Sequence, residues 1–222
     1  MLIPLNDERW GGTTAIVVYT LIVINLIIFG YQISLSPWQL EGWFQSWAVI
    51  PQLFVADPLR HLITLISSQF LHGSPLHLIG NMWFLYVFGH SLEDWLGSRW
   101  FLPFYLGAGV VAALIQVCFS AQSPIPMVGA SGAIAGVMGG YLICFPRVRV
   151  RSLLWLGFFF TFVRVPAVFY LGLWFAFEAY RAWQSNPNEP GVAYMAHVGG
   201  FVLGMAVLAL VRWRDRQRDS PP

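Results

Sequence analysis

The sequence contains no lysine and few charged residues of any kind. Only 10% of the 222 residues are charged, and all 12 basic residues are arginine, whereas soluble proteins carry about 25% charged residues. Hydrophobic residues make up 57% of the chain, more apolar surface than a soluble domain of this length could bury in one core. The composition excludes an ordinary soluble protein and predicts a lipid bilayer as the solvent for most of the chain.

Cysteine is also scarce. Cys118 and Cys144 both lie within apolar runs, which favours two buried thiols over a disulfide or a metal pair. The net charge is only +2, and the arginines stand in short loops and near the C-terminus. That placement suits control of membrane topology better than nucleic-acid binding, so neither a nucleic-acid partner nor a metal is expected. No A-x-A-like cleavage site follows the first apolar run, which begins near Thr14, so we expect this run to be an uncleaved span.

Six apolar runs are long enough to cross a bilayer, which takes about 20 residues per helix. They are Thr14–Ser34, Leu76–Leu92, Trp100–Ala121, Met127–Phe145, Val165–Trp183 and Val192–Val211. Two shorter pieces, His61–His72 and Leu153–Val163, are interpreted as interfacial or re-entrant helices. The predicted fold is therefore all-α: a polytopic six-transmembrane-helix bundle with a short external loop helix and an interfacial segment before the fifth span.

Arginine placement predicts the orientation of this bundle. With the N-terminus inside, the external segments hold only Arg60 and Arg181, and nearly all other arginines face the cytoplasm, as the positive-inside rule requires. We expect one membrane domain over residues 14–211, between a cytoplasmic tail of residues 1–13 and an arginine-rich cytoplasmic tail of residues 212–222. The lysine-free composition suggests a bacterial plasma membrane.

Polar residues gather at one depth of the predicted bundle. The second, fourth and sixth spans run in the same direction, and near their N-terminal ends they carry His77 with Asn81, Ser131, and His197, respectively. Small residues recur at every fourth position from Gly132 and from Ala196, and such stripes let helices approach closely in lipid. If the two stripes face each other, the Ser131 hydroxyl lies within reach of the His197 imidazole.

These residue types suit nucleophilic catalysis. A neutral imidazole can take the proton of a serine hydroxyl, and backbone N–H groups at a helix start can stabilise an oxyanion. His77 and Asn81 lie on one helical face and could add donors. Taken singly, Ser131 among glycines is more often a packing residue, and a membrane His or Asn often bridges helices. The matched depth on three spans favours a site.

Three segments together resemble the rhomboid family of intramembrane serine proteases. They are Gly129-Ala130-Ser131-Gly132, His77-Leu78-Ile79-Gly80-Asn81, and Ala196-His197-Val198-Gly199-Gly200, and the resemblance runs from about Arg60 to about Gly204.

The resemblance implies a rhomboid-like bundle and a role for each matching residue. Ser131 matches the nucleophile, His197 the general base, and Asn81 with His77 the side-chain part of an oxyanion hole that includes the Ser131 backbone. It also implies supporting roles for Gly129 and for Glu93, a structural acid at the inner end of the second span. No cofactor is implied, and the implied substrates are transmembrane segments of single-pass or other membrane proteins, cut near the extracytoplasmic face.

Two positions depart from the family pattern. Leu59 stands where many members have tryptophan before the arginine, and Ala135 stands where many have an aromatic residue beneath the imidazole. Tyr141 and Tyr194 are the candidates to hold the His197 ring instead. The external carboxylates Asp57 and Glu189 lie in loops and are interpreted as solvated charges, so a Ser–His dyad without an acid is expected.

Two other functions are weighed. A non-catalytic rhomboid-like protein that binds client helices would resemble the fold but lack Ser or His, and this chain keeps both. A channel or transporter would carry polar residues along several spans at mid-depth, whereas here they cluster at one end. The sequence therefore predicts an intramembrane serine endopeptidase that acts on membrane-protein substrates within the lipid bilayer.

Overall fold

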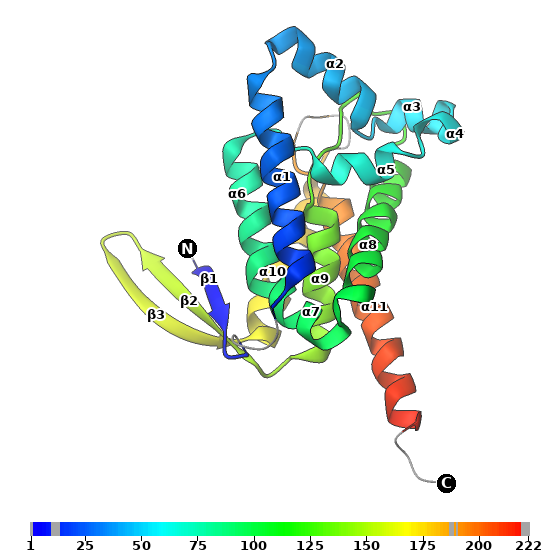
Figure 1. The fold of residues 1–222 in the computed structure, drawn as a ribbon. Helices are drawn as coiled ribbons and strands as arrows, with labels where there is room; N and C mark the ends of the chain where they lie inside the picture. Colours follow the sequence, from blue (N-terminus) through cyan, green and yellow to red (C-terminus); the bar gives the residue numbers. More distant parts are fainter. Residues whose placement is uncertain (1, 10–13, 187–188, 190, 219–222) are drawn as a thin grey trace.

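The computed structural model describes residues 2–9, 14–186, 189 and 191–218 (Figure 1). The long helices are α1 (Ile16–Ser34), α8 (Ser98–Phe119), α9 (Ser131–Cys144), α10 (Ala167–Gln184) and α11 (Tyr194–Arg218). The shorter ones are α2 (Pro37–Trp47), α3 (Pro51–Ala56), α4 (Pro58–His61), α5 (Thr64–Ser67), η1 (Ser68–Phe70), α6 (Pro75–Phe84), the π-helical η2 (Leu85–Gly89) and α7 (His90–Leu96). Residues 10–13 and 219–222 of the two predicted tails lie outside the described residues.

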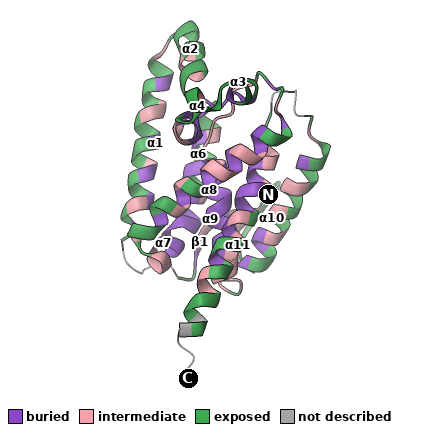
Figure 2. Cartoon of the chain, turned by 90° about the vertical axis from the view of Figure 1, so that its right-hand side faces the viewer, coloured by how far each residue is buried: buried purple, intermediate pink, exposed green. Residues whose placement is uncertain are grey.

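Helix α9 occupies the centre of the bundle. Residues 132–141 are all buried, and Figure 2 shows buried residues concentrated there while exposed ones cover the outer faces. Small side chains make this central position possible, because they let α8 and α11 come close to the α9 backbone. A Cβ added at Gly136 would lie 2.5 Å from the Ala108 Cβ of α8.

The stripes on α9 and α11 face each other, as the four-residue spacing predicts. A Cβ added at Gly200 would lie 2.1 Å from the Gly132 carbonyl oxygen, and one added at Gly204 would lie 1.9 Å from that of Gly136. The obstacles are backbone atoms, which cannot rotate away as a side chain can. Glycine at these positions sets the distance between the helices that carry Ser131 and His197.

We expect Gly204→Ala to destabilise the protein by ~1–3 kcal/mol, as overpacking of a close contact does. The substitution would push α11 away from the Gly136 carbonyl. Gly172→Ala on α10 is the matched control, since a Cβ there meets nothing within 4 Å and alanine favours the helix. Thermal unfolding in detergent measures both. Equal melting temperatures for the two variants would contradict the close contact.

The outer surface is apolar, the reverse of a soluble protein. Ile16, Ile27 and Ile33 on α1 are 63%, 67% and 69% exposed. Among the described residues, three helices are long and apolar enough to cross a membrane: Ile16–Ser34, Ser98–Phe119 and Tyr194–Asp215. The described part of the chain thus supports three of the six predicted spans by length and composition. Helix α9 is apolar but has only 14 residues, about 21 Å.

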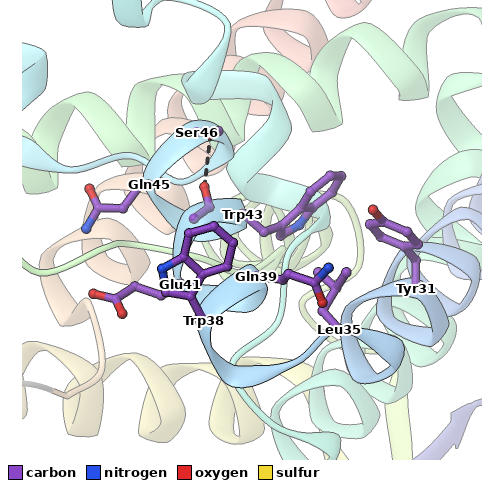
Figure 3. A pocket seen from close by; sticks show the side chains of 9 residues that line it. Tyr31, Leu35, Trp38, Gln39, Glu41, Trp43, Gln45 and Ser46 are labelled. Carbon is purple, nitrogen blue, oxygen red and sulfur yellow. Dashed lines mark hydrogen bonds between the residues drawn. The ribbon is translucent and has the colours of Figure 1, made fainter.

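Short helices close one end of the bundle, at the top of Figure 1. The segment His61–His72, predicted as one external helix, is divided among the end of α4, α5 and η1. Helix α2 lies against the end of α1, where Trp38, Gln39 and Trp43 line a groove with Tyr31 and Leu35 (Figure 3). Trp38 is 82% exposed, as expected for a tryptophan at a membrane–water interface.

The prediction of an all-α fold is wrong in one region. A three-stranded antiparallel sheet, in the order β1-β2-β3, lies beside the other end of the bundle (Figure 1). Its strands are β1 (Leu2–Asp7), β2 (Arg149–Leu156) and β3 (Phe159–Pro166). The segment Leu153–Val163, predicted as an interfacial helix, belongs to the β2–β3 hairpin.

Local sequence explains the hairpin. The two strands are rich in valine, phenylalanine and leucine. Of these, β-branched valine and aromatic phenylalanine favour strands. Leu156 pairs with Phe159, so that only Gly157 and Phe158 form the turn. Gly157 has φ +69°, which the first central residue of a two-residue hairpin turn requires and glycine adopts without strain.

Candidate active site

Ser131 and His197 meet at the end of the bundle closed by the short helices. The Ser131 Oγ lies 2.7 Å from Nε2 of His197, a hydrogen-bonding distance. Ser131 is the first residue of α9, and His197 is in the first turn of α11 and buried. The glycine contacts below them hold the two helix starts side by side, so that the predicted juxtaposition of the two residues is observed.

The second nitrogen of the imidazole contacts a carboxylate. Nδ1 of His197 lies 2.6 Å from Oε2 of Glu178, on α10, and the two side chains are only 11% and 15% exposed. The expectation that no acid accompanies the Ser–His pair is therefore wrong. The carboxylates considered from the sequence were in loops, whereas this one lies within a helix.

His77 and Asn81 both face the backbone just before Ser131. A Cβ added at Gly129 would lie 2.8 Å from the His77 ring and 3.5 Å from Nδ2 of Asn81. Gly129 has φ +124°, a conformation that other residues rarely adopt. Glycine at this position leaves room for the His77 ring and lets the chain turn into α9.

His72 was not singled out by the sequence, yet it contacts a predicted site residue. Its Nε2 lies 2.9 Å from Nδ2 of Asn81, and its backbone is bonded to the Gln32 amide. Burial, followed by the proximity of His77, lowers the pKa of His72 to about 3, so the ring is neutral at physiological pH. A neutral ring accepts at Nε2, which turns the NH₂ group of Asn81 toward it.

A cavity of ≈ 580 Å³ opens beside these groups. Ser131, His197, His77 and Asn81 all line it. The start of α9 adds backbone N–H groups that have no acceptor within the helix. Among the residues that the structure describes, no three His, Cys, Asp or Glu side chains are grouped so as to hold a metal ion.

Three further residues singled out in the sequence are Glu93, predicted to play a supporting role, and Tyr141 and Tyr194, the candidates to hold the His197 ring. Glu93 accepts hydrogen bonds from the backbone N–H groups of Val17 and Val18, at 2.9 and 2.8 Å, and so caps the start of α1. Tyr141 donates to Asp7 at 2.5 Å and is therefore not the residue that holds His197. Tyr194 lies edge-on to the imidazole, with ring centroids 6.3 Å apart.

Two residues of the site were missed, and one of them had a signal in the sequence. Glu178 is the only acidic residue in the predicted span Val165–Trp183. A carboxylate within a membrane span is costly, and such residues face the interior and mark functional sites. His72 is the last residue of the short apolar piece His61–His72 and has no comparable signal, because its contact with Asn81 depends on how the chain folds back before α6.

The fold and the site define a helical membrane protein with a partly buried serine–histidine pair at one end. The chain belongs to the rhomboid family: residues 59–214 match the family model for the Rhomboid domain. The resemblance seen in the three sequence segments is thereby confirmed.

Curated relatives are similar over most of this chain. It is 31% identical to Rhomboid protein 1, mitochondrial, of Saccharomyces cerevisiae, over 85% of this chain and 51% of the relative. It is 30% identical to RHOMBOID-like protein 12, mitochondrial, of Arabidopsis thaliana (78% and 54%) and 26% identical to Presenilin-associated rhomboid-like protein A, mitochondrial, of Danio rerio (69% and 39%). The chain thus spans about half the length of these relatives or less.

The predicted location in a bacterial plasma membrane, with cytoplasmic termini, is contradicted by these relatives, which are named as mitochondrial proteins. Arginine bias gives the orientation of helices relative to a membrane. It carries no information on which membrane that is, and the lysine-free composition could not supply it.

Proposed function

We propose that this protein is an intramembrane serine endopeptidase. Ser131 is the nucleophile, His197 the general base, and the substrates are transmembrane segments of other membrane proteins in the bilayer. The observation that carries the proposal is the 2.7 Å contact between the Ser131 Oγ and Nε2 of His197 at the start of a buried helix. The proposal also includes six membrane-spanning units: α1, the continuous α6–η2–α7 segment, α8, α9, α10 and α11.

The first half of the reaction forms an acyl-enzyme. The Ser131 oxygen attacks the scissile carbonyl carbon while its proton passes to Nε2 of His197. The carbonyl oxygen becomes an oxyanion, which the Ser131 backbone N–H and the side chains of Asn81 and His77 stabilise. The C–N bond then breaks, and the leaving amine takes the proton from Nε2.

The second half releases the acyl group. A water molecule from the cavity gives a proton to Nε2 of His197 and attacks the acyl carbon. The bond to the Ser131 oxygen breaks, and the serine recovers its proton from the imidazole. The products are a carboxylic acid, an amine and the original enzyme, and the acid passes its proton to the amine to give a carboxylate and an ammonium group.

Labelling with a fluorophosphonate tests this proposal directly. The reagent phosphonylates a serine whose hydroxyl is activated by a base, so we expect wild-type protein to incorporate one label, at Ser131. Gel fluorescence and peptide mapping locate it. Unlabelled wild-type protein of normal melting temperature would contradict the proposal and favour the alternative, a rhomboid-like protein that only binds client helices. The preserved serine–histidine contact supports the protease.

A further inference from the structure

Glu178 is the one acidic residue of α10, and its carboxylate lies against the catalytic site. The Oε2 atom is 2.6 Å from Nδ1 of His197, and its side chain is 15% exposed. A carboxylate in such surroundings is costly unless it is paired and hydrogen-bonded. The imidazole N–H supplies that partner, so the position of Glu178 depends on its contact with His197.

The remaining groups around the imidazole define its setting. Trp174 lies one helical turn before Glu178, with its ring centroid 6.1 Å from that of His197. Tyr194 packs edge-on from α11, and Arg181 of α10 donates to the Tyr194 hydroxyl at 3.2 Å.

Three other helices also face the imidazole. Ser131 of α9 bonds to the opposite nitrogen, and His77 of α6 lines the cavity that His197 also lines. Neutral Gln116 of α8 and His197 line the same cavity. Of these groups, Glu178 is the carboxylate in hydrogen-bonding contact with the imidazole.

We propose that Glu178 is a positioning residue that completes a Ser131–His197–Glu178 triad. This inference rests on the proposed serine protease function and replaces the expected dyad. The carboxylate accepts the Nδ1 proton and so fixes the tautomer whose Nε2 has a free lone pair toward Ser131. When Nε2 takes the serine proton, the ionised carboxylate stabilises the imidazolium and takes up no proton itself.

The triad also explains what holds the His197 ring in a chain that has Ala135 in place of an aromatic residue. This chain has Ala135 where many family members have an aromatic residue, and Tyr141, the aromatic residue of α9, is bonded to Asp7. Instead α10 provides both Glu178, which fixes the direction of Nδ1, and Trp174, which packs beside the ring. The orientation of the general base therefore depends on α10, a helix that carries neither the nucleophile nor the base.

Glu178→Gln tests the triad, because glutamine keeps the size of the side chain and removes its charge. We expect kcat to fall by ~10²–10⁴-fold with little change in KM, as loss of a triad carboxylate does elsewhere. The acid limb of the pH–rate profile should move to lower pH, because imidazolium loses its anionic partner. Glu178→Asp retains the charge and should recover part of the rate. Cleavage of a transmembrane model substrate in liposomes gives kcat and KM. The rate of fluorophosphonate labelling, measured from pH 5 to 9, gives the position of the acid limb.

Glu41→Gln is the matched control. It makes the same chemical change on exposed α2, at the same end of the bundle, and should leave all these values unchanged. A Glu178→Gln rate within about twofold of wild type would overturn the triad. The triad would also be overturned if Glu178→Gln lowered the rate only in proportion to a lowered melting temperature and left the acid limb of the pH–rate profile in place. That result is expected if the Glu178–His197 contact does no more than join α10 to α11. Failure of the wild type to label would instead overturn the protease function itself.

Discussion

Replacing Ser131 or His197 by alanine should abolish cleavage of a transmembrane substrate, with a loss of ~10⁶-fold in kcat for each variant. Alanine at 131 removes the attacking oxygen, and alanine at 197 removes the group that takes its proton. The double variant should be no worse than either single one, because the two residues act as a unit. Cleavage is measured in liposomes with purified protein, and product bands are compared with those of a mock preparation.

Folding must remain intact for this result to bear on catalysis. Ser46→Ala and His61→Ala serve as matched controls, because both residues lie in the short helices at the same end of the bundle and neither lines the cavity beside the serine–histidine pair. All four single variants should melt near the wild-type temperature. Cleavage by Ser131→Ala well above the mock preparation would remove Ser131 as the nucleophile.

The meeting of Ser131 and His197 could be predicted because two periodic stripes determine which helix faces touch. Gly200 and Gly204 lie against the backbone of Gly132 and Gly136, one and two turns below the site. Residues four positions apart lie on the same face of a helix, so each stripe shows which face of its helix packs against the other helix. Two residues at the starts of such helices are therefore brought together once the stripes pack.

Glu178 escaped prediction for a different reason. The external carboxylates Asp57 and Glu189 lie in loops, whereas Glu178 is a single carboxylate within a span whose average hydropathy is apolar. A hydropathy window measures whether a segment can enter a bilayer, whereas the cost of one buried carboxylate reveals its function. Glu178 is the only carboxylate within any of the six predicted spans, and this is the feature of the sequence that singles it out.

The sheet could not be inferred from the length of apolar runs. The segment Leu153–Val163 is apolar enough for an interfacial helix, yet its strands begin earlier, at Arg149, and continue to Pro166. Its partner strand, Leu2–Asp7, is more than 140 residues away along the chain. Such long-range pairing depends on tertiary structure, and strand propensity alone is a weak guide.

Replacing Asn81 by alanine should lower kcat by ~10²–10³-fold with little change in KM, if its amide donates to the oxyanion. The structure places Nδ2 of Asn81 near Gly129 and 2.9 Å from Nε2 of His72. One N–H of the amide is thus occupied by His72, and the other remains for the tetrahedral intermediate. Single-turnover cleavage measures this effect on the chemical step.

The contact with His72 also offers a purely structural explanation, which a second variant separates from catalysis. His72→Ala breaks the same hydrogen bond from the other side but keeps the Asn81 amide. If Asn81 only joins two segments, each substitution should cost about 1–3 kcal/mol of stability and leave turnover of the folded fraction nearly unchanged. If Asn81 is an oxyanion donor, both variants lose stability, but Asn81→Ala loses far more of its rate. Equal rates for the two variants at matched melting temperatures would remove Asn81 from the oxyanion hole. The backbone N–H of Ser131 and the His77 ring would then be the donors.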